Sequence, residues 1–237
     1  MDIVYKRILL KLSGEALSNN ENSPINDEFC TNIATVIKKT LELGCEIGIV
    51  VGGGNFWRGR TTNKMNKSTA DYMGMFATIM NSLAIRDSLY RVGVDAEIMS
   101  ALDVPKITQP VDYFMADKFL KNKKVVIFAG GTGSPFFTTD TAAVLRAIDI
   151  NADAILLAKS IDYVYSSDPK IDKNAIKYDK LTYKEMINKN LKVIDMTAAT
   201  LCEENNQTML LFSLENPENI IKIVSGQKIG TILKGEF

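Results

Sequence analysis

The sequence predicts an α/β protein in which helices cover both faces of a mainly parallel sheet. Short apolar runs rich in β-branched residues alternate along the chain with longer segments whose apolar residues recur at helical spacing. The apolar runs are continuous, as in Val-Val-Ile-Phe at 125–128, and do not alternate with polar residues. Strands of that kind are buried on both faces, which requires a layer of helices on each side and hence a three-layer α/β/α sandwich.

Apolar runs mark the expected strands, and periodic segments mark the expected helices. The strands are placed at 8–12, 47–51, 94–99, 125–128, 154–158 and 209–212. The helices are placed at 27–43, 71–92, 140–149, 183–189, 197–205 and 217–225. We expect Gly44 and Gly93 to end the first two helices, and Ser68 or Thr69 to cap the second.

Length and composition exclude several classes of protein. The 237 residues fit a single domain, with lobes at about 1–150 and 151–237. Lys+Arg and Asp+Glu each number 28, so the chain lacks the basic field that a dedicated nucleic-acid binder needs. Hydrophobic residues make up 46%, which excludes a disordered chain. The absence of histidine excludes a histidine base, nucleophile or metal ligand.

The sequence favours a cytoplasmic protein without a membrane partner. Its first residues lead directly into an apolar strand and contain no signal peptide. The longest apolar runs are about five residues, too short to span a bilayer. Three cysteines, far apart and odd in number, are typical of a chain kept reduced.

Three of the expected strands end in glycine-rich turns. These are Lys-Leu-Ser-Gly at 11–14, Gly-Gly-Gly-Asn at 52–55 and Gly-Gly-Thr-Gly-Ser at 130–134. Open parallel sheets bind ligands outside the carboxyl ends of their strands, and glycine lets backbone N–H groups converge on an anion. The turns therefore predict a phosphate site. Because the sequence contains no G-x-x-x-x-G-K-[ST], a P-loop fold is excluded.

Two basic residues are candidate phosphate ligands. Lys11 lies inside an apolar run, where a buried ammonium group is costly unless it meets an anion. The alternative is an edge lysine that extends to water. Arg58, which follows the triple glycine, is either a second phosphate ligand or a surface arginine.

Aspartates at strand ends and helix starts are candidate catalytic or binding groups. They are Asp140, Asp162, Asp168 and Asp195. The structural alternatives are helix caps for Asp140 and Asp195 and a turn for Asp168. Their shared position near the expected phosphates favours carboxylates that orient a lysine or hold Mg²⁺ through water.

The lack of histidine suits one reaction in particular. Phosphoryl transfer depends on positioning and on neutralising the charge of the moving group. A phosphate acceptor is largely a dianion at neutral pH, since its second pKa is about 6, so it needs no general base. Lysine, backbone amides and a metal ion then suffice.

At four segments the chain resembles the bacterial uridylate (UMP) kinases of the amino-acid kinase superfamily, and the match covers essentially its whole length. The segments are KLSGEAL at 11–17, GGGNFWRG at 52–59, ADYMGM at 70–75 and GSPFFTTD at 133–140. The last two separate UMP kinases from relatives that form acylphosphates. The resemblance implies the amino-acid kinase fold and transfer of the ATP γ-phosphate to UMP with Mg²⁺. It makes 1–150 the UMP lobe and 151–237 the ATP lobe.

The resemblance also implies site residues. Lys11 would steady charge on the transferred phosphoryl group, and the catalytic set would add Asp140, Asp162 and Asp195. The implied ATP contacts are Lys11, Leu12, Ser13, Gly14, Gly54, Arg58, Tyr165 and Asp168. Lys159 stands where relatives usually carry Thr or Asn, and its place at a strand end makes it a further candidate contact of the triphosphate. The implied UMP contacts are Gly53, Asp71, Thr132, Gly133, Ser134, Pro135, Phe136, Phe137, Thr138 and Thr139. No residue is assigned as a direct metal ligand.

The helix expected at 71–92 is apolar around more than one face, which predicts burial on two sides. It is either an internal core helix or, as the resemblance implies, the dimer contact within a homohexamer. The resemblance further makes UTP a candidate inhibitor.

Two other functions remain open. The first is a kinase of a carboxylate or carbamate, which requires the segments around Asp71 and at 136–139 to be coincidental. The second is a sensor that binds uridine nucleotides without phosphoryl transfer. Its supporting feature is Tyr163, where the family usually has glycine. If that glycine has a positive φ, a tyrosine in its place implies an altered turn.

Overall fold

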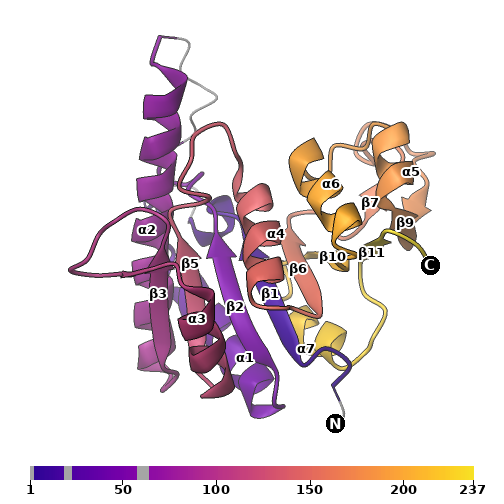
Figure 1. The fold of residues 1–237 in the computed structure, drawn as a ribbon. Helices are drawn as coiled ribbons and strands as arrows, with labels where there is room; N and C mark the ends of the chain where they lie inside the picture. The colour runs from indigo at the N-terminus through magenta and orange to yellow at the C-terminus, as the bar shows by residue number, and fades with distance from the viewer. Residues whose placement is uncertain (1–2, 19–22, 58–63) are drawn as a thin grey trace.

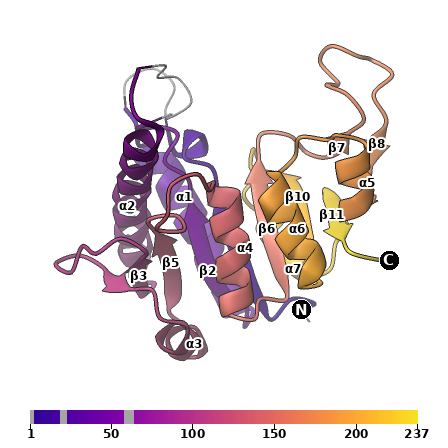
Figure 2. The same cartoon turned by 45° about the horizontal axis from the view of Figure 1, so that its top comes forward.

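The centre of the protein is a nine-stranded sheet (Figures 1 and 2). The computed structural model describes residues 3–18, 23–57 and 64–237. The strand order is β4-β3-β5-β2-β1-β6-β10-β11-β9. In that order the strands are Gln109–Pro110, Ala96–Ser100, Val125–Ala129, Glu46–Val51, Arg7–Leu12, Ala154–Lys159, Met209–Ser213, Thr231–Lys234 and Lys180–Thr182. Within the described residues every neighbouring pair is parallel except β10 and β11, so the predicted mainly parallel sheet is confirmed.

Helices form a layer on each face of the sheet (Figure 1). One layer contains α1 (Asp27–Glu42), α2 (Lys67–Arg91) and α7 (Asn219–Val224). The other contains α3 (Tyr113–Lys121), α4 (Thr139–Asp149), α5 (Tyr183–Asn188) and α6 (Met196–Glu204). Leu10 of β1 packs into the first core and Leu9 into the second, because successive strand residues face opposite ways. The predicted three-layer sandwich is confirmed.

Short elements complete the fold. They are a 3-10 helix, η1 (Glu15–Leu17), and a hairpin of β7 (Val164–Tyr165) with β8 (Lys177–Tyr178). The sequence predicted neither these nor α3, β4, β9 and β11. None of the described helices combines the length and the apolar character needed to cross a bilayer.

Helix ends show which sequence signals decide the boundaries. Gly44 and Gly93 take positive φ angles of 93° and 80° just beyond α1 and α2, as expected. The cap expected for α2 is wrong, because the helix begins one turn earlier. Asn66 accepts a hydrogen bond from Thr69 N and so caps the helix at Lys67.

Within this chain α2 is buried on one face only, so the interpretation as an internal core helix is wrong. Ile79, Ile85 and Leu89 pack into the core. Phe76 is 53% exposed and Met80 is 43% exposed on the opposite face. The outer face of α2 therefore carries large apolar side chains that no other part of the described chain covers.

The first prediction concerns the core. Leu156 lies on central strand β6 and is fully buried. We expect Leu156→Ala to lower the free energy of unfolding by about 2–5 kcal/mol, since it removes buried methyl groups and leaves a cavity. Urea unfolding measures this change. The control is Ile171→Ala, at a side chain 84% exposed, which should change stability by no more than about 0.5 kcal/mol. Equal losses would contradict the assignment of Leu156 to the core.

Candidate active site

The carboxyl ends of β5, β2, β1 and β6 lie side by side at one edge of the sheet. The glycine turns that follow β1 and β2 touch there. A Cβ atom added to Gly14 would lie 2.6 Å from Gly54 N and 2.7 Å from Gly52 O. Such distances are too short for any real side chain, so the close approach of the two turns requires glycine at position 14.

The third glycine turn follows β5 and depends on backbone conformation. Gly130, Gly131 and Gly133 all have positive φ angles, of 76°, 59° and 80°. A Cβ atom on Gly130 would also come within 2.9 Å of Ser100 Oγ. Both the φ angle and the space require glycine there, and the three predicted turns do lie at the same edge.

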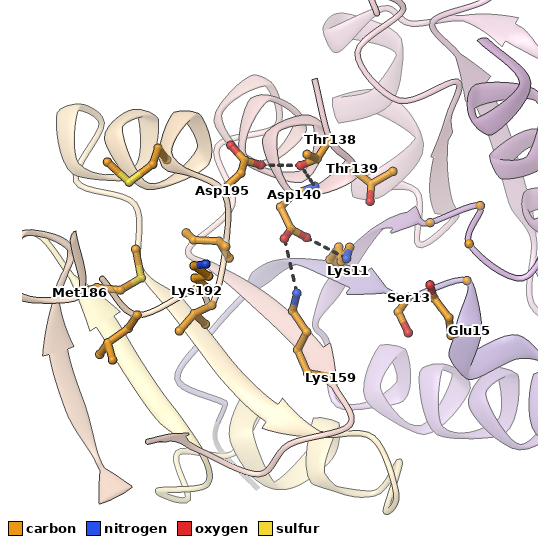
Figure 3. Close-up of a pocket in the computed structure, with 18 of the residues that line it drawn as sticks. Lys11, Ser13, Glu15, Thr138, Thr139, Asp140, Lys159, Met186, Lys192 and Asp195 are labelled. Atoms are coloured by element: carbon orange, nitrogen blue, oxygen red, sulfur yellow. Dashed lines mark hydrogen bonds and ion pairs between the residues drawn. The ribbon is translucent and has the colours of Figure 1, made fainter. Parts of the chain in front are cut away.

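A cavity of about 650 Å³ opens at this edge (Figure 3). Strand ends supply Lys11 and Lys159, and the first turn of α4 supplies Asp140. The glycine turns contribute Ser13 and Gly14 together with the 52–54 segment. The far wall is the segment 190–196.

Asp140 holds both lysines in this cavity. Lys11 Nζ lies 2.8 Å from Asp140 Oδ1, and Lys159 Nζ lies 3.4 Å from Asp140 Oδ2. The side chain of Lys11 is 7% exposed, so it does not reach bulk water. The edge-lysine alternative is therefore wrong. The cap alternative for Asp140 is also wrong, because Thr138 caps α4.

The pKa shifts of this cluster have clear causes. Burial by itself raises the pKa of Asp140, but the charges and hydrogen bonds of Lys11 and Lys159 outweigh it, and the pKa falls below its ordinary value. Burial lowers the pKa of Lys159, and the nearby charge of Lys11 lowers it further against the attraction of Asp140. Lys11 and Lys159 present two ammonium groups to the cavity, which suits an anionic ligand, and Glu15, Lys192 and Asp195 also border it.

Asp195 borders the same cavity, but its carboxylate is already engaged. It accepts hydrogen bonds from the hydroxyl groups of Thr138 and Thr141 and, at 2.9 Å, from Ala198 N. It therefore caps α6, as one interpretation of the sequence expected, and ties α6 to the start of α4.

A second cavity of about 140 Å³ adjoins the first and shares Gly53, Gly54, Thr138 and Thr139 with it. Asp71, from the start of α2, borders only the smaller cavity. Its carboxylate accepts a hydrogen bond of 2.8 Å from Phe136 N. Asp71 thereby joins α2 to the loop after β5.

Only part of the predicted UMP-binding segment 132–139 lines this second cavity. Thr132, Phe137, Thr138 and Thr139 border it. Gly133, Ser134, Pro135 and Phe136 are not among its lining residues. Phe136 has a positive φ of 73° and a side chain 67% exposed, and its contribution is the backbone N–H that binds Asp71.

A third cavity of about 580 Å³ lies beyond the segment 190–193, which also borders the first cavity. Tyr165 and Asp168 line it, so the structure places these two predicted ATP contacts together. The segment 190–193, with Lys192, is a wall of both cavities that sequence reasoning missed. Its only signal was the pair of lysines in Lys-Asn-Leu-Lys at 189–192.

Other predicted site residues lie elsewhere. Asp162 is exposed, accepts hydrogen bonds from Tyr163 N and the Tyr165 hydroxyl at 3.0 and 3.1 Å, and borders none of these three cavities. The side chain of Leu12 is fully buried in the core. Arg58 lies outside the described residues. Tyr163 has no positive φ, and an altered turn relative to the family's glycine stays a prediction.

The donor groups do not fit a metal ion held by the protein alone. The described part of the chain contains no group of three acidic or cysteine side chains placed around a common point. Asp140 is occupied by two lysines and Asp195 by two threonines. Mg²⁺ usually keeps several waters and binds substrate phosphates, so it needs no such cage.

Two adjoining cavities between a lysine pair and glycine turns suit two anionic ligands and the transfer of a phosphoryl group between them, which defines the site of a phosphotransferase outside the P-loop class. A sequence model described as "Amino acid kinase family" matches residues 6–213. The chain therefore belongs to the amino acid kinase family.

Solved structures of the same fold are similar over nearly all of the chain. A UMP kinase from Bacillus anthracis is 36% identical with a TM-score of 0.95, and the match covers 98% of this chain and 97% of that one. A UMP kinase from Ureaplasma parvum is 37% identical with a TM-score of 0.91, covering 97% and 98%. A uridylate kinase from Archaeoglobus fulgidus is 30% identical with a TM-score of 0.74, covering 95% and 99%.

The second prediction tests the shared carboxylate. The pKa of Asp140 in the folded protein lies below its ordinary value of 3.8, so its ionised form stabilises the fold above that pH. This contribution is lost as the pH falls through the folded pKa. We expect Asp140→Asn to lower the free energy of unfolding by about 3 kcal/mol at pH 7, because two partly buried lysines lose their partner. The difference from wild type should shrink below about pH 4.

The measurement is urea unfolding of both proteins from pH 3 to 8. The control is Glu218→Gln, which removes an exposed ion pair with Lys39 and should cost at most about 1 kcal/mol. A difference between wild type and Asp140→Asn that does not vary with pH would show that the carboxylate is not held ionised by the lysines.

Proposed function

We propose that this protein is a UMP kinase that transfers the γ-phosphoryl group of ATP to UMP and yields UDP and ADP. The observation that carries the proposal is the Lys11–Asp140–Lys159 cluster in a cavity that shares Gly53, Gly54, Thr138 and Thr139 with a smaller one. Two adjoining cavities suit two nucleotides whose phosphates meet at the shared wall. Similarity to UMP kinases over nearly the whole chain supports the choice of acceptor.

The reaction needs charge stabilisation more than proton transfer. An oxygen of the UMP phosphate attacks the γ-phosphorus, a new P–O bond forms, and the bond to the β,γ-bridging oxygen breaks with its electron pair leaving on ADP. UMP is largely a dianion at neutral pH, so no base must remove a proton. Lys11 and Lys159 offset the charge on the moving group, and Asp140 holds the two lysines in place.

In this proposal each lobe binds one nucleotide. Residues 1–150 supply the acceptor site, with Asp71 and the 132–139 segment around UMP. Residues 151–237 supply the donor site, with Tyr165 and Asp168 around ATP. Ser13, Gly14, Gly54 and Lys159 line the path of the phosphates between the lobes, and Arg58 is assigned to it by resemblance alone.

The carboxylates differ in their support. Asp140 has direct geometric support as the residue that organises the lysines. Asp195 acts on the site through Thr138, because its carboxylate accepts a hydrogen bond from the Thr138 hydroxyl group. A catalytic role for Asp162 stays a prediction. We propose that Mg²⁺ enters with ATP and is held by phosphate oxygens and water.

The exposed apolar face of α2 supports contact with a second copy of the chain through that helix, and a homohexamer built from such dimers is assigned by resemblance alone. Met73, Phe76 and Met80 recur at spacings of three and four residues, so they form one stripe on its outer face. A second copy of α2 would cover this stripe. UTP stays a candidate inhibitor. Three buried cysteines without disulfides support a reducing, cytoplasmic location.

The third prediction concerns the products of the proposed reaction. Mixing the purified protein with Mg-ATP and UMP should give equal amounts of UDP and ADP, measured by anion-exchange chromatography. CMP, acetylglutamate, glutamate and carbamate serve as competing acceptors. If a carboxylate or carbamate is phosphorylated and UMP is not, the protein is a carboxylate or carbamate kinase. If UMP binds and is not phosphorylated, the protein is a sensor.

Lys11→Ala is the companion variant for this assay. It should lower kcat by at least about 100-fold, since an ammonium group aimed at the moving charge is lost. Calorimetric UMP affinity should change little, because Lys11 borders the larger cavity only. A surviving rate would remove Lys11 from the reaction.

The fourth prediction concerns the acceptor site. Asp71→Ala should raise the KM for UMP by about tenfold or more and leave the KM for ATP nearly unchanged, because Asp71 borders only the smaller cavity. Lys67→Ala is the control, since it removes the ion pair with Asp71 but leaves the carboxylate. Equal effects on both KM values would move Asp71 out of the acceptor site.

A further inference from the structure

The buried face of α2 carries polar side chains, which neither the helix itself nor its packing against the core requires. Thr78, Asn81 and Ser82 are 2%, 0% and 0% exposed, whereas Phe76 and Met80 on the other face are exposed. An ordinary surface helix has the reverse pattern. Burial of a polar group is costly unless it is hydrogen-bonded, so the partners of these side chains indicate what they do.

Thr78 binds the third glycine turn. Its hydroxyl donates to Met75 O at 2.7 Å and accepts from Gly130 N at 2.8 Å. Because the hydroxyl proton is donated within the helix, the oxygen is free to accept the hydrogen bond from Gly130 N. Gly130 is buried and has a positive φ, and Thr78 therefore fixes an N–H that no water can satisfy.

Asn81 binds the second glycine turn at both ends. Its Nδ2 donates to Gly52 O and to Asn55 Oδ1, each at 2.7 Å, and its Oδ1 accepts from Asn55 Nδ2 at 2.9 Å. Gly52 N in turn donates to Leu12 O at 2.9 Å. One buried amide thus sets the shape of the 52–55 turn, which packs directly against Gly14.

We propose that Thr78 and Asn81 are positioning residues that hold the glycine turns in the shape required for phosphoryl transfer, an inference that rests on the proposed UMP kinase activity. The two side chains act on different parts of the site. Thr78 itself borders the smaller cavity and not the larger one, as does Gly131, which follows the glycine that Thr78 binds. Gly53 and Gly54, in the turn held by Asn81, border both cavities. Thr78 therefore positions the acceptor site, and Asn81 positions the junction of acceptor and donor.

The fifth prediction uses three variants of α2. Thr78→Val keeps the shape of the side chain but leaves Gly130 N without an acceptor, and the KM and the calorimetric Kd for UMP should rise about tenfold or more. The KM for ATP should stay unchanged. Thr78→Ser restores the hydroxyl and should restore UMP binding. Asn81→Leu should raise the KM values for both nucleotides.

Ser82→Ala is the matched control. Ser82 is equally buried on the same face, but among the described residues its hydroxyl donates only to Thr78 O within the helix, so both KM values should match wild type. Melting temperatures separate folding from positioning. If Thr78→Val lowers the melting temperature and leaves UMP affinity at the wild-type value, Thr78 is purely structural and the inference is overturned. A wild-type protein inactive on UMP would instead overturn the proposed function.

Discussion

The carboxylate of Asp140 holds two ammonium groups together at one edge of the sheet, and the architecture around it follows from that requirement. Two positive charges repel each other strongly where water is scarce, so the pair persists only with a negative group between them. Lys11 and Lys159 come from adjacent parallel strands, β1 and β6, whose carboxyl ends lie side by side. Asp140 comes from the first turn of α4, where the helix dipole also favours a negative charge.

The two ammonium groups of this cluster border a cavity, and this suits the cavity to an anionic ligand. Burial alone opposes the charged forms of Asp140 and of Lys159, as the direction of each effect on pKa shows. In the proposed reaction the phosphates of ATP lie against these ammonium groups and displace water. The backbone groups of the glycine turns add donors that need no reorganisation when the ligand arrives.

Glycine turns are adaptable by nature, so a site built from them needs rigid support. The turns after β1 and β2 touch through Gly14, which fixes their separation. The buried hydrogen bonds from α2 to Gly52 and Gly130 fix their shape. The same helix places Asp71 at the smaller cavity and presents apolar side chains outward. α2 is thus at once a wall of the site, a support for its turns and a surface suited to a second copy.

Local sequence signals predicted the regular part of the fold well. Continuous apolar runs located the central strands, and the helical period located α1, α4 and α6. These elements are long enough for burial to produce a regular pattern of apolar residues along the sequence. The glycine turns and Lys11 also stood out, since glycine-rich turns and a lysine within an apolar run are costly without a ligand. Short elements such as α3 and β7 escaped, because their few buried contacts come from distant parts of the chain.

The sequence by itself determined the α/β class, the edge of the sheet at which the glycine turns gather and the residue types available for chemistry there. Only the tertiary structure decided which aspartate serves the lysines. Asp140, Asp162 and Asp195 look alike along the chain, yet Asp140 meets two lysines, Asp195 caps α6 and Asp162 binds a tyrosine hydroxyl. Which role each aspartate takes depends on strand order and on the direction in which each helix starts. Both are set by packing between segments far apart in the chain.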